Sequence, residues 1–430
     1  MENLLVNKVA AVKEVRQAAE YQKKKQACIL TGLAGSSKPV FFAAADKLLG
    51  GKGSMAFITA SREEIRTYRR ELNYLYPDLP MQELYPVSLP RVQADTQSLE
   101  LQAGRAAALR FLSGEERGIV FITAEALQQK QLRPSGMSGK ALQLAVGEEH
   151  EQRNIAAALL DLGYERTEQV DALGQFCLRG DILDVYPINS SAAVRIEWFD
   201  NELDAMRSFD VDTQRSLQTL SSIKIAPLKV DESFSYDADI FEYCAADTMV
   251  VVDEPVHVFS MLEKLDKENK EHASELFGKQ ELIEQLAANG AVLVSALGHS
   301  YLQQLPSLNI PVRAVAPYNK NTNLLVEDLQ NWLAEGITPL IMLSGSIKAR
   351  GFADNLRNYG LKGHFAQKSF EPGVVNVTYG DLDHGFRFWD EEWLLLTEND
   401  IFGMQKRKRL HTKNQGQQLQ YFSDIKAGDY

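Results

Sequence analysis

Short apolar runs separated by polar, helix-forming stretches recur along the first third of the chain. The runs are ACILTGL, SMAFITA and GIVFITA. Between the last two, apolar residues recur at helical spacing: Ile65, Tyr68, Leu72 and Leu75. Ser61 followed three residues later by Glu64 forms a capping box, which predicts where this helix begins. Strands that alternate with helices are typical of a parallel α/β layer.

The pattern changes to β structure between residue 146 and about residue 228. One helix, EQRNIAAALLDLG, ends at Gly163, and the runs FCLRGDILDVYP and AVRIEWFDNELDAMRSFD follow with strand-like alternation. Asp200 and Asn201 are typical of a hairpin turn in the second run. The period of two divides that run into one face with Val194, Ile196 and Trp198 and an opposite face with Arg195, Glu197 and Phe199.

The α/β pattern resumes after Pro227 with TMVVVDEP, a helix through MLEKLDKEN and the run AVLVSAL. A further alternation begins near residue 311 and contains TPLIML, a helix at FADNLRNYG, VVNVTYG and WLLLTE. We therefore expect an α/β fold with a degenerate P-loop-like, RecA-like parallel sheet domain, split by an inserted β-rich α+β domain and followed by a second α/β domain. The predicted ranges are 1–133 with 229–312, the insertion 134–228, the second domain 313–403 and a linker 404–430.

Length and charge narrow the function classes. A chain of 430 residues has room for about three domains. Its formal net charge of −12 has the wrong sign for a protein that neutralises phosphates over its whole surface, so any nucleic-acid contact must be local. Three single cysteines predict neither a disulfide framework nor a metal site. The absence of a long apolar run predicts a cytoplasmic protein without membrane contact. We also expect a monomer.

A damaged phosphate loop follows the first apolar run. Against the pattern G-x-x-x-x-G-K-[ST], the chain keeps Gly32 and Lys38, with Gly35 between them. Ser37 replaces the second glycine, and Pro39 replaces the hydroxyl residue that would hold magnesium and also removes a backbone N–H. We expect a structural relic that binds no nucleotide.

Asp253 and Glu254 follow the apolar run that ends at Val252, in the position of the acidic box of helicase-type ATPases. The same residues, with Pro255 after them, also suit the beginning of a helix. Together with the damaged loop, they indicate an ATPase fold that has lost its site.

Arg179, Arg195 and Phe199 lie in the β-rich insertion. Arginine and aromatic side chains dominate the energetics of protein interfaces, so this set is a candidate protein anchor. The alternative is that Phe199 packs under a neighbouring strand while both arginines form solvated ion pairs. The residues alone leave both interpretations open.

Other candidate chemistry is sparse. The basic run Lys406 to Arg409 lies in the predicted linker, where such runs are usually solvated. The seven histidines show no arrangement with serine, cysteine or aspartate that predicts a nucleophile. We predict no catalytic residue and no metal site.

Long segments of the chain resemble known proteins. LGYERTEQVDALGQFCLRGDILDVYP and the following VRIEWFDNELDAMRSFDVDTQRS resemble the module shared by UvrB and the family of transcription-repair coupling factors (Mfd). UvrB proteins carry an intact phosphate loop, whereas the degenerate loop here resembles that of the coupling factors. DLDHGFRFWDEEWLLLTENDIFGMQKRKR and FSDIKAGDY resemble the end of their third domain and the start of their RNA polymerase-interacting domain.

The resemblance implies a function that the residues alone do not give. Coupling factors recognise stalled RNA polymerase, displace it with an ATP-driven translocase on double-stranded DNA, and recruit UvrA. The resemblance places the UvrA contact of the inserted domain on Arg179, Arg195 and Phe199. It implies that polymerase, DNA, ATP and magnesium are bound by domains beyond this chain, which would itself be non-catalytic and need no cofactor.

Two alternatives belong to other function classes. A UvrB-type ATPase fragment for damage verification would bind nucleotide at the loop, and a purely structural spacer would bind no repair protein.

Overall fold

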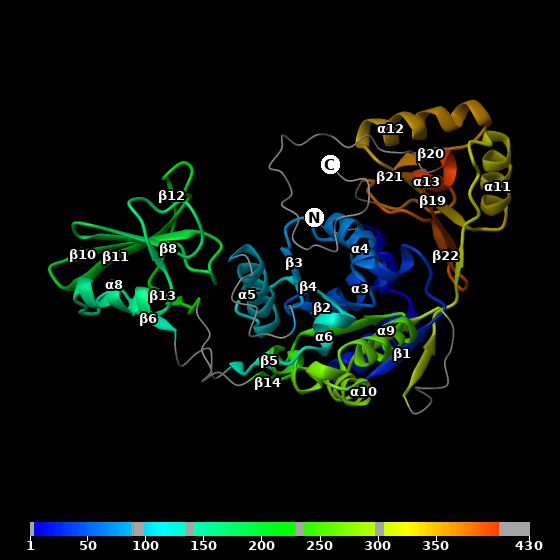
Figure 1. Ribbon diagram of the computed structural model, residues 1–430. Helices are drawn as coiled ribbons and strands as arrows, with labels where there is room; N and C mark the ends of the chain where they lie inside the picture. The colour runs from blue at the N-terminus through cyan, green and yellow to red at the C-terminus, as the bar shows by residue number, and fades with distance from the viewer. Residues whose placement is uncertain are drawn as a thin grey trace, which may run out of the picture.

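The computed structural model describes residues 4–87, 89, 99–134, 141–228, 236–296, 305–367 and 369–403. Within these residues the chain forms a seven-stranded sheet, two six-stranded sheets and two short strand pairs (Figure 1). The predicted α/β fold class is confirmed.

The seven-stranded sheet is parallel throughout and has the order β17-β1-β16-β15-β2-β4-β3. Its strands are β1 (Cys28–Thr31), β2 (Met55–Thr59), β3 (Met81–Leu84), β4 (Ile119–Thr123), β15 (Met249–Asp253), β16 (Val292–Ser295) and β17 (Ser307–Asn309). Strands from before and after the insertion therefore belong to one sheet, as the apolar runs predict.

Helices cover both faces of this sheet. One face carries α1 (Leu4–Ala10), α2 (Lys13–Lys23), α3 (Ser37–Leu48) and α4 (Arg62–Leu75), and the other carries α5 (Leu99–Ser113), α6 (Ala124–Gln128), α9 (Pro255–Glu268) and α10 (Lys279–Ala288). The predicted capping box of Ser61 and Glu64 begins α4. Strand residues alternate between the two cores, since Phe57 belongs to the first and Ile58 to the second.

The insertion forms its own sheet of order β12-β11-β10-β9-β8-β7, with α8 packed on one face. Its elements are β6 (Leu142–Ala145), α8 (Gln152–Asp161), β7 (Glu165–Arg166), β8 (Gln175–Arg179), β9 (Ile182–Val185), β10 (Ala193–Phe199), β11 (Glu202–Phe209), β12 (Ser216–Thr219) and β13 (Ser222–Ile225). β6 pairs with β13, and the flanking strands β5 (Gln131–Leu132) and β14 (Tyr236–Ala238) pair with each other. Gly163 adopts a left-handed φ of 95° after α8, as its predicted cap requires.

The remaining sheet is mixed and has the order β18-β22-β23-β19-β21-β20. Its elements are β18 (Val312–Ala314), α11 (Thr322–Ala334), β19 (Thr338–Leu343), α12 (Ser346–Asn355), β20 (Gly363–Phe365), β21 (Val375–Tyr379), β22 (Phe386–Phe388), β23 (Trp393–Thr397) and α13 (Glu398–Phe402). The helix predicted at FADNLRNYG begins earlier, at Ser346, and its last residues form a 3-10 turn over Leu356–Tyr359.

This third sheet does not have a core of its own on both faces. Ile341 and Leu343 of β19 pack in a cluster with α11 and α12. Leu340 and Met342 of the same strand belong instead to the cluster that contains α1 and α3. The mixed sheet and the seven-stranded sheet therefore share one hydrophobic core. This shared core holds the loop after β21 against the domain of the seven-stranded sheet.

The predicted linker 404–430, including Lys406 to Arg409, and the predicted boundary near residues 135–140 lie outside the described residues. The domain limits stay predictions. No helix in the described part of the chain is long and apolar enough to cross a membrane.

Candidate functional site

The face of the inserted sheet opposite α8 gathers the predicted anchor residues. On β10, Val194, Ile196 and Trp198 are buried in the core beneath α8, which confirms the predicted alternation. Arg195 and Phe199 therefore lie on the opposite face. The predicted turn is also confirmed, because Phe199 pairs with Glu202 and Asp200 has a left-handed φ of 57°.

Strand order places Arg179 beyond a strand that the sequence did not reveal. The strands of Arg179 and Arg195 are not neighbours, because β9 lies between β8 and β10. Asp184 of β9 sits opposite Arg195 on one side and Cys177 on the other. Arg179 pairs with Ile182, at the end of the sheet where Phe199 also lies.

Asp184 joins the two arginines. Its side chain is only 3% exposed and accepts bonds from Arg195 Nε at 2.6 Å and Nη2 at 2.8 Å. Arg179 Nη2 reaches the same carboxylate at 3.2 Å. Hydrogen bonds to Asp184 raise the pKa of the Arg195 guanidinium, which also lies 4.7 Å from the ring centre of Phe209. Arg195 is therefore held in one orientation, whereas the Arg179 side chain is 55% exposed.

Two apolar side chains on the same face as these arginines are exposed to solvent. Phe199 is 77% exposed, so the alternative in which it packs under a neighbouring strand is wrong. Ile182, which alternation places on the same face as Asp184, is 36% exposed. A half-open apolar pair flanked by guanidinium groups can receive an apolar side chain and a carboxylate from a protein partner.

Sequence reasoning missed Asp184 and Ile182. The run RGDILDVYP holds the signal, because period two puts Ile182 and Asp184 on the face opposite Leu183 and Val185. An acidic residue on a strand between two arginine-bearing strands predicts that its carboxylate pairs with both arginines, but only when the strand order is known.

The predicted phosphate loop lies between β1 and α3. Gly32 and Gly35 both have left-handed φ values, 88° and 52°. Pro39 is the third residue of α3, in the first turn, where a missing N–H costs no helical bond. The backbone N–H groups of Ser37 and Lys38 donate to carbonyls of Ala34 and Gly35 at 3.2 Å each. These donors, which a phosphate would need, are already used.

The loop lysine is paired with the acidic box. Lys38 Nζ lies 2.7 Å from Asp253 Oδ1 and 2.8 Å from Glu254 Oε1. Burial lowers the pKa of Lys38, but the two carboxylates outweigh it and the net shift is upward. Burial raises the pKa of Asp253, which Lys38 and a hydrogen bond from Tyr68 only partly offset. Glu254 directly precedes α9, which begins at Pro255, as the helix-start interpretation predicts.

A turn of the third sheet covers the loop. The N–H groups of Asp383 and His384 donate to Ser36 Oγ at 3.1 and 2.9 Å. Ser36 donates in turn to the buried carboxylate of Glu71, which also accepts the Asp383 N–H at 2.8 Å. A Cβ on Gly35 would lie 3.2 Å from His384 Cβ. The residues present therefore do not fit a magnesium nucleotide, and no group of three or more metal-ligating side chains gathers elsewhere in the described part.

Comparison with known proteins gives one match to the insertion and further matches to most of the chain. Residues 142–230 match the family described as the UvrB interaction domain. Relatives named transcription-repair-coupling factor are similar over most of the chain. The protein of Bacillus subtilis is 23% identical over 94% of this chain and 40% of its own length, and that of Staphylococcus epidermidis gives the same values. The chain resembles transcription-repair coupling factors.

A third relative of the same name, from Escherichia coli, is 28% identical over 38% of this chain and 14% of its own length. The family resemblance predicted from the sequence is confirmed by these matches. The chain spans about 40% of the length of the relatives that it matches most fully.

Proposed function

We propose that this chain is the part of a transcription-repair coupling factor that recruits UvrA, and that the face of the inserted sheet with Arg179, Ile182, Arg195 and Phe199 is the docking surface. The observation that supports this proposal most is that Phe199 is 77% exposed on the same face as two arginines that pair with the buried Asp184. The match of residues 142–230 to the UvrB interaction domain supports the same region.

The aromatic and the arginine side chains would contribute to binding in different ways. Phe199 supplies apolar area that gains free energy only when a partner covers it. Arg195 is oriented before binding, because Asp184 holds two of its nitrogens, so little side-chain entropy is lost on docking. Arg179 keeps donors free toward solvent and can pair bidentately with a carboxylate of UvrA.

The phosphate loop supports recruitment over the ATPase alternative. Lys38 is held by Asp253 and Glu254, and the turn with Asp383 and His384 occupies the loop. We therefore propose that this part is non-catalytic and uses no cofactor. Polymerase displacement by ATP-driven translocation on double-stranded DNA then belongs to other parts of the full-length protein, and a cytoplasmic, monomeric state stays a prediction.

A titration with purified UvrA tests the proposal. The wild-type chain should bind, and Phe199→Ala should weaken binding by about 2 kcal/mol or more, roughly 30-fold. Trp389→Ala is the matched control, because Trp389 is another exposed aromatic residue, 54% exposed, in the turn after β22 of the mixed sheet. Equal affinity of the Phe199 variant and the wild type would contradict the docking surface, and no binding of UvrA by the folded wild type would contradict recruitment itself.

A further inference from the structure

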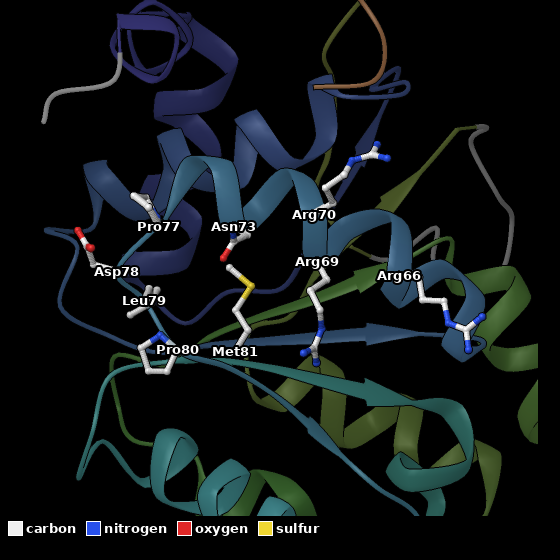
Figure 2. A pocket seen from close by; sticks show the side chains of 9 residues that line it. All are labelled: Arg66, Arg69, Arg70, Asn73, Pro77, Asp78, Leu79, Pro80 and Met81. Atoms are coloured by element: carbon white, nitrogen blue, oxygen red, sulfur yellow. The ribbon is translucent and has the colours of Figure 1, made fainter. Parts of the chain in front are cut away.

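A hollow of about 660 Å³ lies between the outer side of α4 and the segment that leads into β3 (Figure 2). Most of its polar lining comes from α4 and includes Arg66, Arg69 and Asn73, about one helical turn apart. Its apolar lining comes from Leu79 and the residues after it, Pro80 and Met81. The site is separate from the face of the inserted sheet and from the phosphate loop.

Two of the α4 arginines lack an acidic partner, and two do not. Arg62 Nε lies 2.7 Å from Glu83 on β3, and Arg70 pairs with Asp383 of the third sheet's turn. In the part of the chain that the structure describes, no carboxylate forms an ion pair with Arg66 or Arg69. Both charges partly offset the rise that burial imposes on the pKa of Glu83, but their guanidinium groups form no ion pair with the described residues and can still bind a ligand.

The nearby acids are already engaged or peripheral. Glu64 accepts the N–H of Ala60 at 2.9 Å in the capping box, and Glu83 holds Arg62. Asp78 lines the hollow on the loop before β3, away from the arginines along the helix (Figure 2). The middle of the hollow is thus cationic within a chain of net charge −12.

The arginines differ in how they are presented. Figure 2 shows Arg69 directed toward the strands below α4 and Arg66 farther along the helix. Arg70 also lines the hollow, but its guanidinium group extends to the opposite side of the helix from that of Arg69 (Figure 2). The Arg69 guanidinium lies 5.3 Å from the ring centre of Phe121, which limits its motion. Arg66 is exposed and can follow a ligand along the helix.

We propose that this hollow binds a short stretch of single-stranded nucleic acid through its backbone phosphates. Guanidinium groups pair bidentately with phosphate oxygens, and arginines on successive turns can contact successive phosphates of one strand. Leu79, Pro80 and Met81 give a base or sugar an apolar surface to lie against. Two free guanidinium groups make a local footprint, so binding is weak, depends steeply on salt and shows no base preference.

The test is a fluorescence-anisotropy titration of the whole chain with a labelled ten-nucleotide single strand at several salt concentrations. Neutralising about two phosphates predicts a slope of log K against log salt near −1.4 for a single strand. The Arg66→Ala/Arg69→Ala variant should lose most of this slope and bind roughly tenfold more weakly at low salt. Arg69→Lys, which keeps the charge, should retain the slope.

Arg166→Ala is the control, because Arg166 is an exposed arginine on β7 with the same charge change at a distant position. Its affinity and slope should equal those of the wild type. Equal binding by the double variant would overturn the proposal, as would binding of inorganic phosphate or of an acidic peptide at this hollow without binding of the strand. The melting temperature of each variant, which should stay near that of the wild type, shows that the fold is intact.

Discussion

Replacing Arg195 by alanine should destabilise the inserted sheet, although this residue is a predicted contact for a partner. The substitution leaves the carboxylate of Asp184, which is 3% exposed, with Arg179 at 3.2 Å as its remaining cation. Removing one partner of a buried ion pair costs about 3–5 kcal/mol. Because the Arg195 side chain is itself 18% exposed and Arg179 remains, we expect about 2–3 kcal/mol.

Hydrogen exchange is the suitable assay, since a chain with several sheets does not unfold in one step. Amides of β9 and β10 should lose about 2–3 kcal/mol of protection in Arg195→Ala. Arg207→Ala on the same sheet is the control. Arg207 forms an ion pair with Glu197, and their side chains are 31% and 30% exposed. The loss of protection in Arg207→Ala should therefore stay below about 1 kcal/mol.

Neutralising the carboxylate of Asp184, which loses its main partner in Arg195→Ala, should restore stability. In the Arg195→Ala background, Asp184→Asn should recover part of the lost protection because no buried charge remains. If Arg195→Ala leaves β9 and β10 as protected as in the wild type, the buried clamp is not what orders this face, and the reasoning fails.

Three further outcomes follow from the phosphate loop. Magnesium-ATP should give no melting shift through the loop, where a bound ligand at about 100 times its Kd would stabilise by roughly 2.7 kcal/mol; a shift that Lys38→Ala abolishes would refute this. Gly32→Ala should lower the free energy of unfolding by roughly 2 kcal/mol or more, because its Cβ would lie 2.4 Å from the carbonyl oxygen of Ile310 and φ is 88°; an unchanged denaturation midpoint would contradict the close packing. Burial raises the pKa of Glu71 above 4.5 in the folded chain, so the folded state holds this proton more tightly than the unfolded state does. Stability should therefore fall as the pH rises from about 4.5 through the pKa of the folded state. Glu71→Gln should remove that part of the pH dependence, measured by denaturation from about pH 4 to about pH 7, and identical pH profiles would refute it.

Local patterns predicted the elements of this chain well. The apolar runs at β1, β2, β4 and β15 are buried strands, because continuous apolar sequence suits a parallel sheet covered on both faces. The period of two in β10 also placed Arg195 and Phe199 on one face, since alternation depends only on the strand itself.

Contacts between distant segments could not be predicted in the same way. Asp184 becomes a clamp only because β9 lies between the two arginine-bearing strands, and the sequence does not give strand order. Ser36 and Glu71 likewise meet Asp383 across more than three hundred residues, through a core shared by two sheets. Such partners depend on packing, which the local pattern does not encode.

The most direct test of UvrA recruitment is a hydrogen-exchange footprint of the complex with UvrA. The account predicts slowed exchange at the turn-proximal ends of β8, β9 and β10, around Arg179, Ile182 and Phe199, with no change along α12 of the third sheet. Slowed exchange confined to the third sheet or to α4, with the inserted sheet unchanged in the bound state, would contradict it.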